Sequence, residues 1–399
     1  MTEDHDPVPL RGSAPAGHDP PGIQENVALA APQAAVATTD LSWERRRRRR
    51  WPWIVLILVV VVIAGASRWN LNYYALQPGS AQSVQQFIKV PPSMSHPVSH
   101  PVLLTDVEIG RVTALSYLLY RLQGDTSLES VDAVTGGTPP SQLDAQGNLE
   151  MSQAEAAAKT AALRRLGYPV AATAAGAVIF GTYPGTPAYP VLNVGDVITA
   201  VDGTATPTAS DLTATLRHFH SGESVTLTVR RGGSGPPAPV SVTLKSTRVD
   251  LGGGQMATLD LGIQPEDQID YSYPFPVGID VTNIGGPSAG LAMSLGVIDA
   301  LTNGSVTGSR TVAATGTIDS QGDVGDVGGV AQKTVAVENA GASVFLVPPQ
   351  EYKVAMSKDR PGLGIYAVST LDQALTVLAA HGGSVPKPAS SSPVGVGAG

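Results

Sequence analysis

The sequence predicts a multidomain α+β protein with one N-terminal transmembrane helix, a β-rich domain and a final domain of mixed helices and strands. Three observations support this fold class. Ten successive apolar residues, Ile54–Ile63, form the centre of an uncharged segment long enough for a membrane helix. Short apolar segments separated by turn residues predict strands over 168–248. After residue 250, segments with apolar residues at helical spacing are followed by short apolar strands.

Composition limits the classes of function open to this chain. It has 399 residues, with 44 Gly, 32 Pro and only 5% aromatic residues, so we expect flexible segments to flank compact domains. The net charge of −8 at pH 7 argues against a nucleic-acid partner. The absence of cysteine excludes disulfides, thiolate metal sites and a cysteine nucleophile. We expect no metal and no cofactor.

The first part of the chain predicts a single-pass membrane protein. Residues 1–50 are rich in Pro, Ala and Gly without periodicity, which predicts a disordered segment that ends in the arginine run Arg45–Arg50. Residues 51–68, uncharged as far as Arg68, are expected to form the transmembrane helix. Because positive charge marks the cytoplasmic side, the N-terminus is expected in the cytoplasm and the later domains outside it.

Aromatic residues flank this helix, as they do at membrane interfaces. They are Trp51 and Trp53 at one end and Trp69, Tyr73 and Tyr74 at the other. A cleaved signal peptide is the alternative interpretation, because Ala64-Gly65-Ala66 resembles a cleavage site. The segment before the apolar run is much longer than in usual signal peptides, which favours an uncleaved anchor.

Residues 69–167 are interpreted as a stalk followed by a region that packs on the later domains. Leu76–Pro101 is expected to be an extended stalk, and Val102–Ile109 a strand. Thr113–Leu122 and the alanine-rich Glu150–Leu166 are expected to be helices.

Residues 168–248 resemble a bacterial PDZ domain. The resemblance rests on Val194-Gly195-Asp196-Val197-Ile198 with Val201-Asp202-Gly203, on the helix expected at Ser210–Phe219, and on the strand that ends at Arg230-Arg231-Gly232. PDZ domains bind an extended peptide by adding it to a sheet edge beside a helix. A PDZ fold used only as a spacer is the alternative interpretation.

The resemblance implies an edge strand near Val170–Phe180 and a groove helix at Ser210–Phe219. The expected peptide-binding residues are Val178, Ile179, Phe180, Leu212 and Leu216. The loop that would bind a peptide carboxylate has no clear place in the sequence.

A candidate nucleophile, Ser288, lies where a turn meets a helix. Gly285-Gly286-Pro287 predicts a tight turn, and apolar residues recur at helical spacing after Ser288 until Asn303-Gly304 ends the helix. Free N–H groups at a helix N-terminus stabilise the oxyanion that forms when serine attacks a carbonyl. Pro287 has no N–H, so the donors expected are Ser288 itself and either Gly285 or Gly286.

A candidate base, Lys333, lies on a second expected helix after Gly329. Val330, Lys333 and Val337 share one face of this helix at helical spacing. Burial on an apolar face lowers the pKa of a lysine and leaves a neutral amine that accepts a proton. The alternative is a lysine that extends from the edge of this face to water.

The serine and lysine segments together resemble Lon-type serine peptidases over about 250–380. The stretch from Gly286 to Gly290 matches the nucleophile motif of that family, and the stretch from Thr315 to Lys333 matches its lysine segment without a gap. The resemblance implies that Ser288 is the nucleophile, Lys333 the general base, and Thr315 a hydroxyl that helps to hold the lysine. Many members carry an acidic residue three positions before the serine, and this chain has Gly285 there.

The whole chain resembles the bacterial family of membrane-anchored PDZ–Lon proteins, with the Lon-type α/β domain at 250–383 and a disordered tail at 384–399. The resemblance implies an endopeptidase that acts on extracytoplasmic proteins and binds their C-termini in the PDZ groove. Because ATP is not expected outside the cytoplasm, these substrates are expected to be unfolded or flexible. A homo-oligomer formed through the Lon-like domain is compatible with the resemblance, but the sequence does not determine the oligomeric state. No phosphate-binding loop motif occurs, so the expected activity is independent of ATP.

Two other functions remain open at this point. One is a non-catalytic adaptor, in which the PDZ groove binds C-termini and the Lon-like domain is an assembly scaffold. The other is an acyl-transfer enzyme that acts only on itself. The intact Ser288 and Lys333 pair favours the peptidase, and the Gly285 departure leaves the adaptor open.

Overall fold

A computed structural model describes residues 42–136, 138–251, 254–281, 284–302, 305–358 and 361–386. Side chains are described from Arg50 onward, Pro140 excepted. The predictions of disorder for residues 1–41 and for 387–399 lie outside these ranges. The chain divides into two compact units, Met1–Val60 and Val61–Gly399, and each is considered by itself.

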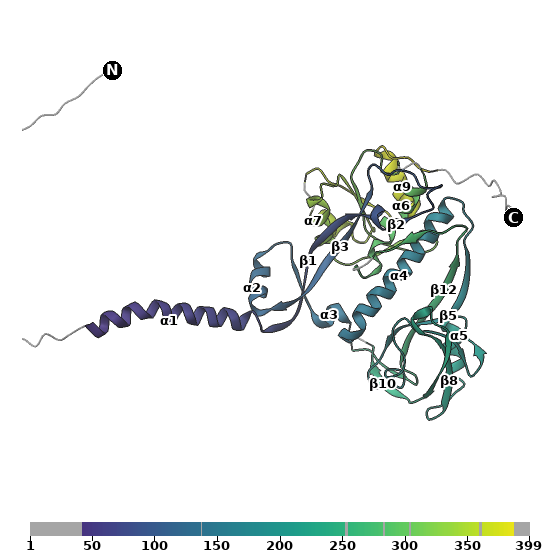
Figure 1. Cartoon of the computed structure of the whole chain (residues 1–399), viewed down its shortest axis with the longest axis horizontal. Helices are drawn as coiled ribbons and strands as arrows, with labels where there is room; N and C mark the ends of the chain where they lie inside the picture. Colours follow the sequence, from purple (N-terminus) through teal and green to yellow (C-terminus); the bar gives the residue numbers. More distant parts are fainter. Residues whose placement is uncertain are drawn as a thin grey trace, which may run out of the picture. The chain divides into compact units, whose positions relative to one another are not determined.

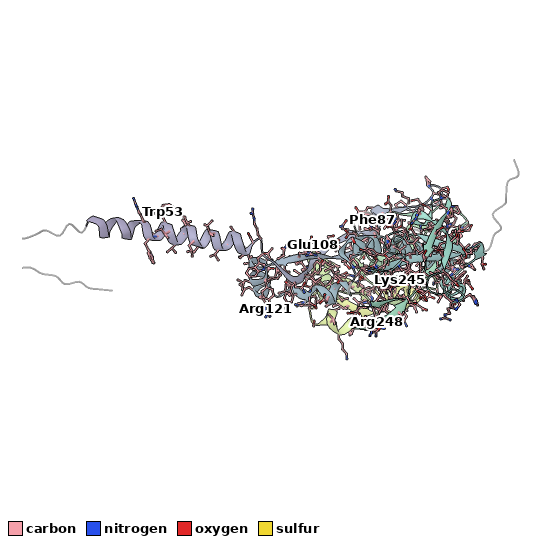
Figure 2. All side chains as sticks on the ribbon, turned by 90° about the horizontal axis from the view of Figure 1, so that it is seen from below. Trp53, Phe87, Glu108, Arg121, Lys245 and Arg248 are labelled. Carbon is pink, nitrogen blue, oxygen red and sulfur yellow. The ribbon has the colours of Figure 1, made fainter. Side chains whose placement is uncertain are left out.

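The helix α1 spans Ser42–Ala66, so it begins earlier than predicted. Residues 42–50 were expected to be disordered, but arginine is a good helix former and the run extends the apolar helix towards the N-terminus. The apolar side chains of Ile54–Ile63 are between 43% and 63% exposed, and Trp53 projects from the helix (Figure 2). Within the described part of the chain, no helix has the length and apolar character needed to cross a membrane.

A six-stranded mixed sheet lies in the second unit, with the order β18-β17-β14-β3-β1-β4. Figure 1 labels its long strands β1 and β3. Its strands are β1 Asn70–Ser83, β3 Val102–Thr113, β4 Ser127–Ser130, β14 Val312–Ala314, β17 Val344–Val347 and β18 Gly364–Ala367. The strand β14 pairs in parallel with both β3 and β17, whereas β1 is antiparallel to β3 and β4. The segment 69–167 is therefore not a stalk with a packing region. It supplies half of the strands of the sheet that also contains the C-terminal strands.

Helices cover both faces of this sheet because its central strands are buried on both sides. Val102 and Leu104 of β3 pack with α4 Pro140–Arg165, α6 Gly290–Leu301 and α9 Leu371–Ala380. The alternate residues of the strands, such as Phe345, pack with α7 Val330–Asn339 and α8 Tyr352–Met356. Every residue of α6 is buried, so the segment that follows Ser288 lies inside the core.

The PDZ-like domain is inserted between the first and the second set of strands of the central sheet. Its sheet has the order β12-β5-β6-β8-β9, with β7 paired to β6. Its elements are β5 Ala171–Thr182, β6 Val197–Val201, β7 Thr204–Ala205, α5 Ala209–Leu216, β8 Ser224–Arg230, η2 Arg231–Gly233, β9 Pro237–Thr243 and β12 Ile263–Ser272. The strand β12 lies beyond the predicted boundary at 248, so this domain extends into the region assigned to the following one.

The long helix α4 connects the two sheets, since it contacts α6 on one side and β5 on the other (Figure 1). It begins ten residues before the predicted start at Glu150. Short elements complete the chain: η1 Val84–Phe87, β2 Ile88–Lys89, α2 Ala114–Leu122, α3 Val131–Thr135, β10 Thr247–Asp250, β11 Met256–Leu259, β13 Gly278–Ile279, η3 Pro287–Ala289, β15 Thr317–Ile318 and β16 Val324–Gly325.

Candidate active site

The turn before Ser288 is held by contacts that require glycine. Gly286 has a φ of +88°, a conformation that L side chains rarely adopt. It leads into the short helix η3, which contains Ser288, and then directly into α6. The carbonyl of Ser288 accepts a hydrogen bond from the N–H of Gly316 at 2.9 Å. A Cβ on Gly290 would lie 2.9 Å from the backbone nitrogen of Ile318, so this glycine permits the close packing of the two segments.

Lys333 is buried, with only 2% of the residue exposed. It lies on α7, the helix that packs against β1 and β3. Its Nζ donates a hydrogen bond to Thr315 Oγ1 at 3.2 Å. Thr315 Oγ1 in turn donates to the carbonyl oxygen of Ser288 at 3.3 Å. The threonine therefore connects the lysine to the serine backbone, and all three predicted catalytic residues lie at one place.

Burial lowers the pKa of Lys333 from 10.5 to about 8, because the charged amine loses its hydration. The negative charges of Asp106 and Glu351 act in the opposite direction and limit this effect. The Asp106 carboxylate is held at a bulge in β1, where it accepts hydrogen bonds from the N–H and the Oγ of Ser80. The amine is thus a base at mildly alkaline pH with two carboxylates near it.

The structure corrects one of the predicted oxyanion donors. The N–H of Gly286 donates to the carbonyl of Gly147 on α4 at 3.0 Å, so it is already occupied. Among the described residues, the N–H groups of Ser288 and Gly285 have no acceptor, and they remain available. The contact from α4 was not visible in the sequence because Gly147 precedes the serine by more than a hundred residues.

A carboxylate from α4 lies beside the serine turn, where this chain lacks the acidic residue that many family members carry. A Cβ built on Gly286 would lie 4.0 Å from Glu150 Oε2. Burial raises the pKa of Glu150, and the negative charge of Glu266 raises it further. A negative group is therefore supplied from a distant segment of the chain, although Gly285 occupies the position of the acidic residue in many Lon enzymes.

A cleft of about 490 Å³ opens over the serine and the lysine. It is lined by residues of β1 and β3, of the serine turn and of the segment before α7: Leu76, Asp106, Val107, Glu108, Ile109, Ile284, Gly285, Gly286, Pro287, Ser288, Gly328, Gly329 and Lys333. The strand β3 pairs with β14 only from Val102 to Leu104. In the described part of the chain no strand pairs with this edge of β3 beyond Leu104, where β3 borders the cleft.

Local sequence signals indicated Ser288 and Lys333, and the family resemblance indicated Thr315, but neither indicated the groups that surround them. Asp106, Glu351 and Glu150 come from three separate segments. Asp106 has one retrospective signal: Gly79 opposite it admits no side chain, since a Cβ there would lie 2.0 Å from Asp106 Oδ1. No glycine or other sequence feature marks Glu351 or Glu150, because acidic residues are common in helices and at their ends.

The predicted peptide-binding strand of the PDZ-like domain is wrong. Val178 and Ile179 belong to β5, which is paired with β12 on one side and with β6 on the other, so its edges are occupied. Phe180 also lies within the stretch that β12 covers, and its carbonyl accepts a hydrogen bond from Gln146. The edge of this sheet is formed by β12, which the sequence placed in the next domain.

A groove of about 330 Å³ lies between α5 and the start of β12. Leu212 and Leu216 line it, as predicted, although Leu212 is only 1% exposed and also belongs to the domain core. The turn Leu259–Gly262 closes one end, and Arg217 adds a positive charge. The sequence did not predict that this turn lies beside the groove, because it falls beyond residue 248.

Comparison with known proteins agrees with both domains. Residues 268–380 match the Lon protease (S16) C-terminal proteolytic domain, and residues 164–242 match the PDZ domain. Lon protease 2 of Bacillus subtilis is 36% identical over 115 residues, which are 29% of this chain and 20% of that protein. The Lon protease of Rickettsia bellii is 33% identical over 121 residues, which are 29% of this chain and 15% of that protein.

The chain thus spans a fifth or less of the length of these relatives. Among solved structures, the PDZ domain of the SdrC-like protein of Listeria monocytogenes is similar, with 21% identity and a TM-score of 0.19, over 23% of this chain and 87% of that one. The match to the Lon domain begins within β12, so the strands β1 and β3 that border the cleft lie outside it.

Proposed function

We propose that this chain, which carries a Lon-type proteolytic domain and a PDZ domain, is a membrane-anchored serine endopeptidase that works without ATP. The observation that carries the proposal is the buried Lys333, whose amine lies 3.2 Å from Thr315 Oγ1 beside the serine turn. A buried lysine with a lowered pKa is the base that a serine hydroxyl needs when no histidine is near.

The proposed reaction uses these groups in turn. Ser288 Oγ attacks the peptide carbonyl while the neutral amine of Lys333 takes its proton. The oxyanion accepts hydrogen bonds from the N–H groups of Ser288 and Gly285. Lys333 then gives the proton to the leaving amine, and the acyl-enzyme remains. A water molecule, deprotonated by the same amine, attacks the ester carbonyl, and Lys333 returns this proton to Ser288 Oγ as the bond to the acyl group breaks and the acid product leaves.

The proposed substrate is an extended segment of an unfolded or flexible protein. The unpaired edge of β3 at the cleft allows a peptide to add as a further strand, which presents its carbonyls to Ser288. The PDZ groove between α5 and β12 receives the C-terminus of such a protein, with its carboxylate at the turn Leu259–Gly262 near Arg217. Both sites thus use strand addition, which selects unfolded segments over folded domains.

The proposed location is the cell membrane, with both domains outside the cytoplasm. Ten apolar residues of α1 are exposed side by side, and a lipid bilayer is the environment that removes such a surface from water. The arginine run precedes this apolar segment, which favours a cytoplasmic N-terminus. A single pass of the membrane and an oligomer formed through the Lon-type domain are further parts of the proposal.

A serine-reactive fluorophosphonate probe tests the function most directly. The full chain in detergent should be labelled covalently, and Ser288→Ala should abolish the label. Ser241→Ala, on the exposed strand β9, is the matched control and should be labelled like the wild type. If the folded wild-type chain takes no label and cleaves no unfolded protein, the peptidase proposal fails and the non-catalytic adaptor becomes the better account.

A further inference from the structure

The short helix α2 exposes the face that a globular protein would bury. Leu115, Leu118, Leu119 and Leu122 recur at positions i, i+3, i+4 and i+7, so they form one apolar stripe. Leu118, Leu119 and Leu122 are 65%, 52% and 85% exposed, and no residue of this helix is buried. The stripe needs an apolar partner that the described residues do not provide.

The orientation of α2 is set by contacts on its other face. Tyr117 packs against Tyr73 of β1, with ring centroids 5.6 Å apart. The hydroxyl of Tyr120 accepts a hydrogen bond from Gln77 Nε2 at 3.1 Å. Thr113 and a serine of the first turn form a capping box at the N-terminus of the helix. The leucine stripe therefore faces away from the sheet as a consequence of specific packing.

The start of α2 lies directly beside the end of α1. The N–H of Ala114 donates to the carbonyl of Trp69 at 2.9 Å, and the N–H of Trp69 donates to the carbonyl of Gly65, in the last turn of α1. Trp69 itself is 71% exposed. If α1 enters a bilayer, these two hydrogen bonds keep α2 at the surface from which the chain emerges.

Three arginines flank the leucine stripe. Arg68 precedes Trp69, and Arg111 and Arg121 lie before and within α2, all of them exposed. The guanidinium of Arg111 lies 5.8 Å from the ring centroid of Tyr74, and the guanidinium of Arg121 lies 5.6 Å from the ring centroid of Tyr117. Apolar side chains bordered by arginine and tryptophan are the composition of helices that lie in a membrane interface.

We infer that α2 is a second membrane contact, which lies flat in the headgroup region of an anionic phospholipid bilayer. Its leucines enter the boundary of the acyl chains, and the three arginines bind lipid phosphates. The inference rests on the proposed membrane anchor and adds to it. A second copy of the chain is the weaker occupant, because four leucines offer far less than the area of about 800 Å² per partner that a stable interface buries.

The contact would orient the proteolytic domain on the membrane. The strands β1 and β3 lead from α2 to the cleft, where Leu76 and Ile109 are paired across the two strands and both line its wall. Two attachment points, α1 and α2, would hold this hairpin at a constant angle to the surface. One attachment point alone would leave the domain free to rotate.

Single-cysteine labelling of the full chain tests the inference, since the natural sequence has no cysteine. Leu118→Cys and Leu122→Cys are labelled with an environment-sensitive NBD dye in vesicles of phosphatidylcholine and phosphatidylglycerol. Val59→Cys on α1 reports on the anchor, and Ser241→Cys on β9 is the aqueous control. Thermal unfolding followed by circular dichroism checks that each variant is folded. We expect blue-shifted emission, quenching by lipid-borne nitroxide and loss of iodide quenching at 118 and 122, with aqueous behaviour at 241.

The remaining outcomes separate this inference from the proposed anchor. A lipid environment at Val59 with aqueous spectra at 118 and 122 overturns the role of α2 and leaves the anchor in place. Aqueous spectra at positions 59, 118, 122 and 241 overturn both the proposed anchor and the role of α2. Protection at 118 that lipid-borne nitroxide does not quench, and that is lost when the chain is diluted with excess lipid, identifies an interface between copies and also overturns the inference.

Discussion

Replacing Lys333 tests the proposed base in two independent ways, by activity and by stability. The pKa of this lysine is lowered from 10.5 to about 8 by burial, against the opposing effect of Asp106 and Glu351. About a tenth of the amine is then neutral at pH 7 and about nine tenths at pH 9. We therefore expect kcat/KM for a small peptide ester to rise about tenfold between these two values through one ionisation.

Lys333→Arg should lose this activity, because arginine stays charged and accepts no proton. A positioned general base contributes about 10²- to 10⁴-fold, and we expect a loss of kcat in this range with little change in KM. Stopped-flow hydrolysis across pH 6 to about pH 10 measures both parameters. Turnover of Lys333→Arg within a few-fold of the wild type would remove this lysine from the mechanism.

The same burial means that the charged form of Lys333 lowers the free energy of unfolding. A pKa lowered from 10.5 to about 8 disfavours the charged form by about 3 kcal/mol in the folded protein. Between these two values the unfolded chain binds more protons than the folded chain, so the stability of the wild type rises with pH over this window.

Lys333→Met keeps the length of the side chain and removes the charge. Its free energy of unfolding, measured by urea denaturation, should exceed that of the wild type by up to about 3 kcal/mol below pH 8, and this advantage should shrink as the pH approaches 10.5. A methionine variant less stable than the wild type at pH 7 would refute a lysine held in a desolvated site.

Three further predictions concern the charge near Lys333, the PDZ groove and the membrane topology. Asp106→Asn removes a charge that raises the pKa of Lys333, so the pH profile of kcat/KM should shift to lower pH, whereas Glu108→Gln in the same cleft should leave it in place. Leu216→Arg in the PDZ groove should raise KM for a protein substrate severalfold and leave hydrolysis of a small ester unchanged. An equal loss of activity on the protein and on the ester would show that the groove supports the dyad instead. A reporter that works only outside the cytoplasm, fused after Gly399, should be active, and activity of a cytoplasm-only reporter there would reverse the proposed orientation.

The positions of the proposed catalytic residues could be predicted from local signals and from the spacing of a family motif. Ser288 follows a glycine-rich turn whose conformation few other residues adopt, and Lys333 interrupts an apolar helix face. Thr315 followed from the family resemblance, and the structure places its hydroxyl 3.2 Å from the lysine amine. Each of these inferences uses residues within one turn or one helix, or a motif of constant spacing.

The arrangement of strands was not predictable in the same way. Leu76–Pro101 was predicted to be an extended stalk, yet its first residues belong to β1, which pairs with β3 and β4 in the central sheet. The strand β12 is separated from β5 by more than eighty residues, and its pairing moved the peptide-binding edge away from Val178 and Ile179. A strand's partner depends on the whole chain, whereas its own residues show only which face is apolar.

The sequence by itself determined the chemistry of this protein: a serine at a helix start, a lysine on an apolar helix face, a PDZ pattern and a leading apolar helix. Only the tertiary structure decided what surrounds them. It placed Asp106 and Glu351 close enough to Lys333 to affect the pKa of the lysine. It brought the carbonyl of Gly147 to the N–H of Gly286, where it accepts a hydrogen bond. It also left the leucines of α2 exposed. Short-range conformational preferences are encoded residue by residue, but electrostatic surroundings and strand order arise from contacts between distant segments, which form only when the chain has folded.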